Sequence, residues 1–579
     1  MENLLEISGL SLDLKQDGNW KSILHEVSFC LGKGETLGIV GESGSGKSVT
    51  ALSVMQLLNP EIARYPKGEI LFYDNPEAEK PINLVNCPEK TMRHLRGNKI
   101  GMIFQEPMTS LNPVIRCGEQ ITEQILLHTT QTKEAAKQHV IELFKEVMLP
   151  RPEQIFNSYP HELSGGQKQR VMIAMAMSCQ PDLLIADEPT TALDVTVQKG
   201  ILELIRKLQR KHGMSVLFIT HDLGVVAEIA DQVLVLYKGK VVEHGDIRKI
   251  FLNPQHPYTQ GLLACRPSMK TRLKKLPTVD DFMRNQTVNM SQMVGDLMVT
   301  PEERKQFHQT LYAEKPIITV QHLSKQYPVR KRKLFEKRQY VNALQDINLE
   351  VYEGETLGLV GESGCGKTTL GRSMIRLIEP TSGEVYYKGT NLMSLSMSQM
   401  RQMRKDLQII LQDPYSSLNQ RLTIGDALME PMRVHNIGSN DKERKRKAVA
   451  LLERVNLDES HFYRYPHEFS GGQRQRISIA RALAVNPRFI ICDESVSALD
   501  VSVQAQVLNL LNELKEEYHF TYIFISHDLS VVRFMSDRIV VMQNGRIVEM
   551  GDADDICDRP QTEYTQKLLS AIPKGILNE

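Results

Sequence analysis

Two short segments combine glycines, a lysine and a hydroxyl at a spacing suited to binding phosphate. Residues 41–48 read GESGSGKS and residues 361–368 read GESGCGKT, so both fit the pattern G-x-x-x-x-G-K-[ST]. Each follows a short apolar run and precedes a helical pattern. In this context the glycines let the backbone wrap around a phosphate, N–H groups at the helix start bind it, and the lysine adds positive charge. The predicted phosphate-binding residues are therefore Gly41, Glu42, Ser43, Gly44, Ser45, Gly46, Lys47 and Ser48, and Gly361, Glu362, Ser363, Gly364, Cys365, Gly366, Lys367 and Thr368.

Acidic pairs follow two other apolar runs, at 187–188 and 493–494. An acid at the carboxyl end of a strand can hold Mg²⁺, and the carboxylate after it can polarise an attacking water. We therefore predict Glu188 and Glu494 as catalytic bases. An acidic pair after a strand also serves as a helix cap, and only the accompanying motifs favour catalysis. The expected metal ligands are Asp187, Asp493, the hydroxyls of Ser48 and Thr368, and the amides of Gln105 and Gln412.

Two further pairs of segments could act on the same phosphate. His221 and His527 each follow an apolar run, where a neutral imidazole can bind a phosphate or orient water. The sequence SGGQ appears twice at the start of a helical pattern, and small residues with free N–H groups at a helix start form an anion site. A helix cap is the simpler interpretation of these segments, and both can hold at once. The residues concerned are Ser164, Gly165, Gly166 and Gln167, and Ser470, Gly471, Gly472 and Gln473.

The elements that must position these groups occur twice along the chain. The phosphate-binding motifs are 320 residues apart, and the later motifs repeat at a constant offset of 306. Apolar runs at 36–40, 183–186 and 215–220 are bounded by turns, as buried parallel strands are. Alternation over 4–14 predicts a half-exposed strand, and Asn544-Gly545 predicts a hairpin. Each repeat is therefore α/β. We expect a first domain at 1–265, a polar linker at 266–315 with a short helix near 301–312, and a second domain at 316–579.

Composition excludes several classes of protein. Lys plus Arg equals Asp plus Glu at 70 each, which argues against a chain built mainly to bind nucleic acid. We interpret the basic stretch 328–338 as a solvated surface loop. No window approaches the ~18 apolar residues that cross a bilayer, and the first residues do not resemble a signal peptide. The eight cysteines have no CxxC spacing, which predicts reduced, buried thiols.

Together these motifs resemble the ATP-binding cassette (ABC) ATPases. GESGSGKS and GESGCGKT match the Walker A motif, LSGGQ and FSGGQ the family signature, LLIADE and FIICDE Walker B, and ALD at 192–194 and 498–500 the D-loop. The resemblance implies two nucleotide-binding domains in tandem. Each would have a RecA-like core, an antiparallel β subdomain and a helical signature subdomain. It also implies ATP and Mg²⁺ sandwiched head to tail, with Lys47 facing Ser470 and Lys367 facing Ser164.

The resemblance carries two further expectations about the ATP sites. Trp20 and Tyr340 each lie 27 residues before their Walker lysine, about where the family stacks an aromatic ring on adenine, although a core aromatic is the alternative. Both sites have a complete set of catalytic residues, so both should hydrolyse ATP. Ser495 replaces Pro189 after the second acidic pair, and we expect slower turnover there at most.

The motif QEPMTSLNP, and HPYTQGLL echoed by TEYTQKLLSAIP, look like cassettes of peptide, opine and nickel uptake systems. The fused form is similar to glutathione-import and microcin C-import ATPases. This implies an importer subunit at the cytoplasmic face of the inner membrane. Its partners would be two permeases and, indirectly, an extracytoplasmic solute-binding protein. Only Cys265 follows HPYT, so no iron–sulfur cluster is expected. The alternative is a tandem-cassette translation factor, which would need a long charged linker and a basic surface.

Overall fold

The computed structural model describes residues 2–16, 18–74, 80–105, 110–191, 193–284, 295–328 and 339–573. Within these ranges each half contains a four-stranded antiparallel sheet and a six-stranded, mostly parallel sheet. The six-stranded sheets have orders β10-β9-β3-β8-β7-β6 and β20-β19-β13-β18-β17-β16, so the two halves share one topology. This confirms the predicted tandem α/β fold.

In the first half the strands are β1 (Asn3–Gln16), β2 (Asn19–Gly32), β3 (Thr36–Val40), β4 (Ala63–Phe72), β5 (Ile82–Asn83), β6 (Ile100–Ile103), β7 (Leu183–Asp187), β8 (Ser215–Thr220), β9 (Gln232–Tyr237) and β10 (Lys240–Asp246). The helices are α1 (Lys47–Val54), α2 (Glu89–Leu95), α4 (Cys117–His128), α5 (Lys133–Glu146), α6 (Pro152–Phe156), α7 (Gly165–Met177), α8 (Val195–His212), α9 (Leu223–Ile229), α10 (Ile247–Leu252) and α11 (Pro257–Ala264).

In the second half the strands are β11 (Pro316–Pro328), β12 (Tyr340–Tyr352), β13 (Thr356–Val360), β14 (Ser382–Tyr387), β15 (Thr390–Asn391), β16 (Leu407–Ile410), β17 (Phe489–Asp493), β18 (Thr521–Ile525), β19 (Arg538–Gln543) and β20 (Arg546–Asp552). The helices are α15 (Lys367–Met374), α16 (Met397–Met403), α17 (Pro414–Ser417), α18 (Ile424–Val434), α19 (Asp441–Arg454), α20 (Gly471–Leu483), α21 (Val501–Tyr518), α22 (Leu529–Met535), α23 (Ala553–Asp558) and α24 (Glu563–Ser570).

The central strands of each large sheet are buried along their whole length. Every residue of β3, β7 and β8 is buried, which explains their unbroken apolar sequences. The strands predicted at 36–40 and 215–220 are confirmed with those bounds, and the predicted hairpin joins β19 to β20. Because parallel strands end at the same sheet edge, this order brings the loops after β3, β7 and β8 together.

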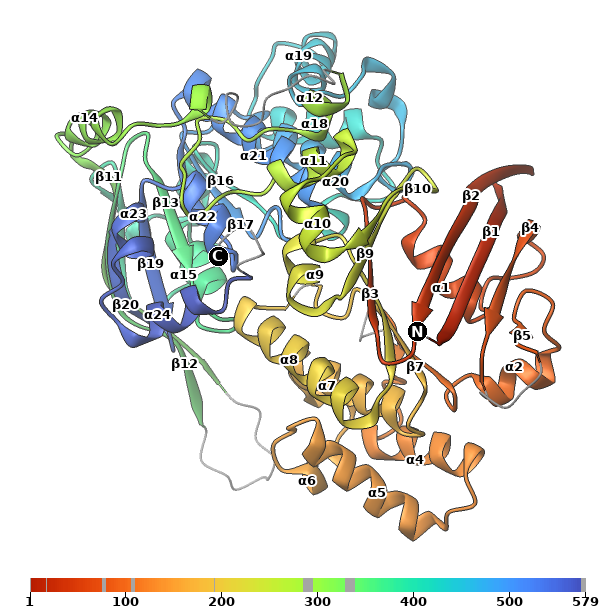
Figure 1. Ribbon diagram of the computed structural model, residues 1–579. Helices are drawn as coiled ribbons and strands as arrows, with labels where there is room; N and C mark the ends of the chain where they lie inside the picture. The colour runs from red at the N-terminus through yellow and green to blue at the C-terminus, as the bar shows by residue number, and fades with distance from the viewer. Residues whose placement is uncertain are drawn as a thin grey trace.

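The two halves lie head to tail. Figure 1 shows the helical unit of the first half, α4–α7, at the opposite end of the molecule from that of the second half, α18–α20. The helical unit of the second half thereby approaches the loop after β3 of the first half, and the two sequences line one cavity. Residues of both halves thus line this cavity.

The connecting segment 266–315 crosses to the second half and binds its surface. It contains α12 (Val279–Arg284) and α14 (Pro301–Leu311), and the latter confirms the helix expected near 301–312. Asn509 of α21 exchanges two 2.8 Å hydrogen bonds with the main chain of Leu276. Arg304 donates to the carbonyl of Asp537 at 2.8 Å and pairs with Asp552 at 3.0 Å. This segment is therefore docked, at least where it is described.

Two expectations about the rest of the chain can be compared with the structure. Among the described helices, none combines the length and the apolar character needed to cross a bilayer. All eight cysteines are free thiols, but only four of them are buried and Cys30 is exposed, so the expectation of buried thiols is only partly met. Cys30 alternates outward on the β2 strand of a half-exposed sheet. The basic stretch 329–338 lies outside the described residues.

Candidate functional site

The predicted phosphate-binding loops connect β3 to α1 and β13 to α15. Gly46 and Gly366 precede the helices with φ of 106° and 111°, a conformation that favours glycine. A Cβ on Gly46 would lie 2.5 Å from the side chain of Leu24, so this position also lacks room for a larger residue. Lys47 and Lys367 begin the helices and are buried. The loops therefore place a lysine and a ring of N–H groups at each helix start.

The lysine ammonium groups are held by carbonyl oxygens. Lys47 Nζ donates to the carbonyls of Gly41 and Glu42 at 2.7 and 2.9 Å, and Lys367 repeats this with Gly361 and Glu362. Burial lowers the pKa of Lys47. Among the described residues no carboxylate forms an ion pair with either lysine, so each is a buried cation suited to an anionic ligand. The buried Ser45 hydroxyl also finds no hydrogen-bond partner among the residues that the structure describes.

A hydroxyl and a carboxylate meet beside each loop. Ser48 Oγ donates to Asp187 at 3.0 Å, and Thr368 Oγ1 donates to Asp493 at 2.8 Å. Burial raises the pKa of Asp187 to about 6 and also raises the pKa of Asp493. Because burial penalises these carboxylates, a divalent cation with oxygen ligands fits the two pairs.

The amides of the two glutamines donate hydrogen bonds to the second residue of each acidic pair, the predicted base. Gln105 Nε2 donates to Glu188 at 3.0 Å, and Gln412 Nε2 donates to Glu494 at 2.6 Å. They thus contact the proposed bases in this structure, and their role as metal ligands stays a prediction.

The predicted base and histidine are in contact in the first half. His221 Nδ1 lies 3.3 Å from Glu188, whose other oxygen also accepts from Thr191 at 2.9 Å. Burial opposes ionisation of Glu188, but the hydrogen bond and charge of His221 outweigh it and lower the pKa of Glu188 to about 2. The glutamate is therefore a carboxylate at neutral pH. Sequence reasoning did not single out Thr191, because one hydroxyl after an acidic pair carries no distinctive pattern.

The second half has a looser version of the same arrangement. His527 Nδ1 lies 3.9 Å from Glu494, and Ser497 donates to the main-chain carbonyl of Glu494 instead of its carboxylate. Arg372 adds a cation 3.4 Å from Asp493. The two sites are thus alike in composition but not in detail.

Both glutamates have an unusual backbone. Glu188 and Glu494 each have a φ of 47°, in the left-handed region that costs free energy for a non-glycine residue. Their N–H groups donate to the carbonyls of Ile219 and Ile525, which fixes the turn. The turn keeps this shape although Ser495 replaces Pro189 in the second half.

The signature segments begin helices of the helical units. Ser164 caps α7 and Ser470 caps α20, each in a capping box with the glutamine three residues later. Ser470 and the two glycines after it line a cavity of about 580 Å³ together with the phosphate loop of the first half. Glu188 and His221 also line this cavity. Residues from opposite halves therefore enclose one space large enough for a nucleotide.

The D-loop of each half forms a hydrogen bond with the phosphate loop of the other half. Asp500 accepts from the N–H of Ser43 at 3.0 Å, and Asp194 accepts from the hydroxyl of Ser363 at 2.7 Å. Ser502 also hydrogen-bonds Glu42. The sequence matched the two aspartates to a family motif but could not assign their partners, which lie hundreds of residues away.

The two candidate adenine-stacking residues have matching positions. Trp20 is in β2 and Tyr340 begins β12, and both are exposed. Three residues after each aromatic residue, the strand passes beside Gly46 or Gly366, the glycine just before the Walker lysine. The guanidinium of Arg64 lies 4.4 Å from the Trp20 ring centroid. Stacking on adenine stays a prediction.

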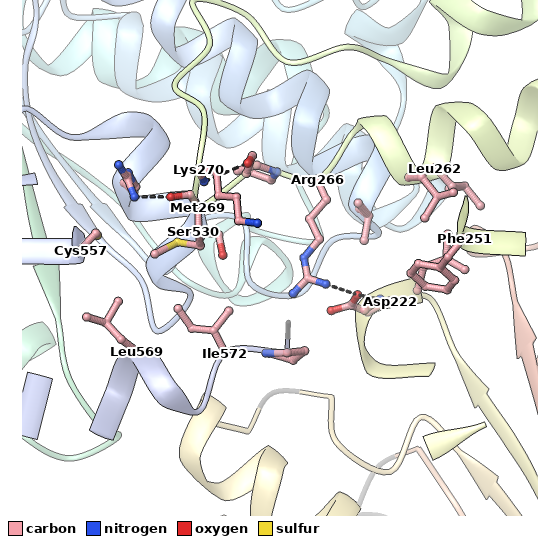
Figure 2. Close-up of a pocket in the computed structure, with 18 of the residues that line it drawn as sticks. Asp222, Phe251, Leu262, Arg266, Met269, Lys270, Ser530, Cys557, Leu569 and Ile572 are labelled. Carbon is pink, nitrogen blue, oxygen red and sulfur yellow. Dashed lines mark hydrogen bonds and ion pairs between the residues drawn. The ribbon is translucent and has the colours of Figure 1, made fainter. Parts of the chain in front are cut away.

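A second cavity, of about 470 Å³, lies between the halves beside the histidine segment of the first half (Figure 2). Arg266, the first residue of the connecting segment, pairs there with Asp222 at 3.4 Å. Its guanidinium lies so close to Gly224 that a Cβ at that position would overlap it. The connecting segment thus contacts the loop that carries His221.

Comparison with known proteins identifies the family of this chain. A family model described as ABC transporter matches residues 24–191 and 344–497. The chain belongs to the ABC transporter ATP-binding family. As in other members, its cassettes bind and hydrolyse ATP. A second model, described as the C-terminal region of oligopeptide/dipeptide transporters, matches 242–290 and 548–575.

Relatives of this ABC protein align along nearly its whole length. Glutathione import ATP-binding protein GsiA of Pectobacterium atrosepticum is 46% identical over 99% of this chain and 90% of the relative. GsiA of Salmonella paratyphi A is 48% identical and that of Escherichia coli K12 is 47% identical, with the same coverage. A solved dimeric cassette, MJ0796 with ADP and phosphate, is 30% identical over 41% of this chain and 98% of its own, with a TM-score of 0.38.

Proposed function

We propose that this chain is the ATP-hydrolysing subunit of a membrane importer for a peptide-like solute, such as a di- or oligopeptide or glutathione. The cavity shared by the phosphate loop of one half and the signature segment of the other carries the proposal, because ATP bound there would join the halves. The two matches to oligopeptide/dipeptide transporter regions and the GsiA relatives support the class of solute.

In the proposed cycle ATP binds between the halves, with its phosphates on Lys47 or Lys367 and on the N–H groups of the loops. Glu188 and Glu494 orient water toward the γ-phosphate, and His221 and His527, beside these carboxylates, bind the γ-phosphate or orient the same water. Bound Mg²⁺, held at each site by the hydroxyl–carboxylate pair, would supply positive charge that stabilises the phosphates during transfer. Hydrolysis then lets the halves separate.

We propose that both ATP sites hydrolyse, since each has its lysine, acidic pair and histidine. The longer distance from His527 to Glu494 supports slower turnover at the second site. Movement reaches the permeases through loops near Gln105 and Gln412; residues 106–109 of the first loop lie outside the described residues. Trp20 and Tyr340 stack on the adenine rings.

The proposal places the chain at the cytoplasmic face of the inner membrane, bound to two permeases and served by an extracytoplasmic solute-binding protein. Its cassettes occupy 1–265 and 316–579, joined by the segment 266–315. No nucleic acid is involved. The cofactor is Mg²⁺, with no iron–sulfur cluster, since Cys265 is the single cysteine of the segment after HPYT.

Capture of the tagged chain from detergent-extracted source cells tests the partners. Two hydrophobic permease chains are expected. Recovery of ribosomes instead would favour the translation factor and contradict the importer.

Reconstitution of the captured complex in proteoliposomes, with ATP on the side of this chain, tests the solute. Uptake of radiolabelled glutathione or a dipeptide should require ATP and the solute-binding protein. A complex that hydrolyses ATP but moves neither compound would contradict a peptide-like solute while leaving the ATPase intact.

A further inference from the structure

In each phosphate loop, one main-chain N–H donates a hydrogen bond to the hydroxyl of a tyrosine that lies outside the loop. The N–H of Glu42 donates to Tyr258 Oη at 2.9 Å, and the N–H of Glu362 donates to Tyr564 Oη at 3.0 Å. The tyrosines belong to α11 and α24, which lie some two hundred residues after the loops in the chain. Both lie in the regions that match oligopeptide/dipeptide transporters. The same contact thus forms independently in the two halves.

The hydrogen-bonded peptide group is the one that also binds the Walker lysine. The carbonyl of Gly41 and the N–H of Glu42 belong to a single peptide unit. Its carbonyl accepts from Lys47 Nζ at 2.7 Å, and its N–H donates to the tyrosine. Lys367 binds the carbonyl of Gly361 at 2.7 Å in the same way. The two bonds hold opposite ends of the peptide and so fix its plane.

This peptide needs such support because a glycine precedes it. Gly41 and Gly361 have φ of 154° and 150°, and glycine rotates with little steric restraint. If the peptide turned over, the carbonyl that binds the lysine ammonium would point elsewhere. The lysine would then no longer be held toward the phosphate site. A hydroxyl on a packed ring is a rigid partner for the N–H, since the ring of Tyr258 is fully buried and lies 4.3 Å from that of Tyr237.

We propose that Tyr258 and Tyr564 are positioning residues of the two ATP sites. Each hydroxyl fixes the first peptide of the phosphate loop and thereby the resting position of the Walker lysine. This gives the tyrosine of the HPYT motif, and of its TEYT echo, a role in nucleotide binding. Burial raises the pKa of Tyr564 to about 12, so its hydroxyl stays protonated at neutral pH.

The test uses the full chain with Glu188→Gln and Glu494→Gln, so that bound ATP is not consumed. Binding of radiolabelled ATP is measured by equilibrium dialysis in this parent and with Tyr258→Phe or Tyr564→Phe added. Phenylalanine keeps the ring and removes only the hydroxyl. We expect each variant to show one site of parental affinity and one weakened about tenfold, because the released peptide leaves only about a tenth of the loops with the lysine held toward the phosphate site.

Tyr522→Phe is the matched control. Tyr522 is a buried tyrosine whose hydroxyl donates to the carbonyl of Leu511 at 3.2 Å, away from both loops. Its loss should leave both affinities within twofold of the parent. Tyr564 is only half-buried, so its variant provides the test if Tyr258→Phe fails to fold. In active chains, each substitution should raise KM for ATP more than it lowers kcat.

Two outcomes would overturn the proposal. In the first, both phenylalanine variants bind two ATP molecules with parental affinity. In the second, either variant weakens both sites equally. That result would mean that the hydroxyl contributes only to the general stability of the chain. Either outcome leaves the ATPase assignment untouched, because that assignment does not depend on these tyrosines.

Discussion

Replacing Asn509 with alanine should release the connecting segment from the second half. The Asn509 side chain accepts from the N–H of Leu276 and donates to its carbonyl, both at 2.8 Å, and both residues are buried. Alanine would leave two buried main-chain groups without partners. Each lost bond is worth ~1 kcal/mol net, and each unpaired group costs ~1–3 kcal/mol until water reaches it. The docked state should therefore lose ~2–4 kcal/mol.

Hydrogen exchange followed by mass spectrometry measures this loss directly. If the free energy of local opening falls by ~2–4 kcal/mol, the amides of the peptides covering 271–284 should exchange roughly 30- to 1,000-fold faster. Lys275→Ala is the control in the same segment, since its ion pair with Glu513 is exposed at both ends. Such a pair is worth at most about 1 kcal/mol, so exchange should change less than about fivefold.

Parental exchange rates in the Asn509→Ala chain would refute the reasoning. They would mean that the two hydrogen bonds do not hold the segment, and that its other contacts suffice.

Three further outcomes are expected. Glu188→Gln together with Glu494→Gln should lower ATP hydrolysis ~10²–10⁴-fold while ATP stays bound, and a parental rate would disprove their role as bases. The carboxylates of Asp537 and Asp552, 3.8 and 3.3 Å from the ring nitrogens of His308, raise the pKa of His308 above 6.5, so its contribution to docking of α14 is complete below pH 6.5 and is lost as pH rises through the raised value. Exchange in α14, corrected for intrinsic rates, should accelerate accordingly, and His308→Gln should abolish this dependence. Gly118→Ala places a Cβ 2.2 Å from an aromatic ring and should destabilise the helical unit by ~1–3 kcal/mol, seen as a lower Tm. Gly200→Ala, with its nearest neighbour at 3.4 Å, should instead raise Tm slightly, and equal shifts would contradict the packing argument.

The ABC fold was predictable because its signals are local. The unbroken apolar runs of β3 and β8 require burial on both sheet faces, and the glycine–lysine motif that follows β3 needs a strand before it and a helix after it. Duplication of every motif, in the same order, then predicted two equivalent halves. The positive φ of Glu188 and Glu494 was not predictable, since neither residue type nor neighbours signal it.

The connecting segment shows where local reasoning stops. Its polar composition predicted a linker with a short helix near 301–312, and that helix is present as α14. Composition could not indicate that Arg304 and Leu276 bind the second half. The groups that hold them belong to main chain and side chains more than two hundred residues away.

By itself, the sequence determined the type of chemistry. A phosphate loop, an acidic pair and a histidine each need particular residues close together in the chain, so their identity and order can be read directly. Only the tertiary structure decided which groups meet. The pairing of Ser43 with Asp500, of Glu42 with Tyr258, and of the first phosphate loop with the signature segment of the second half joins residues far apart in sequence. Such contacts depend on how whole sheets and helices pack, and any one residue type at these positions is compatible with many partners.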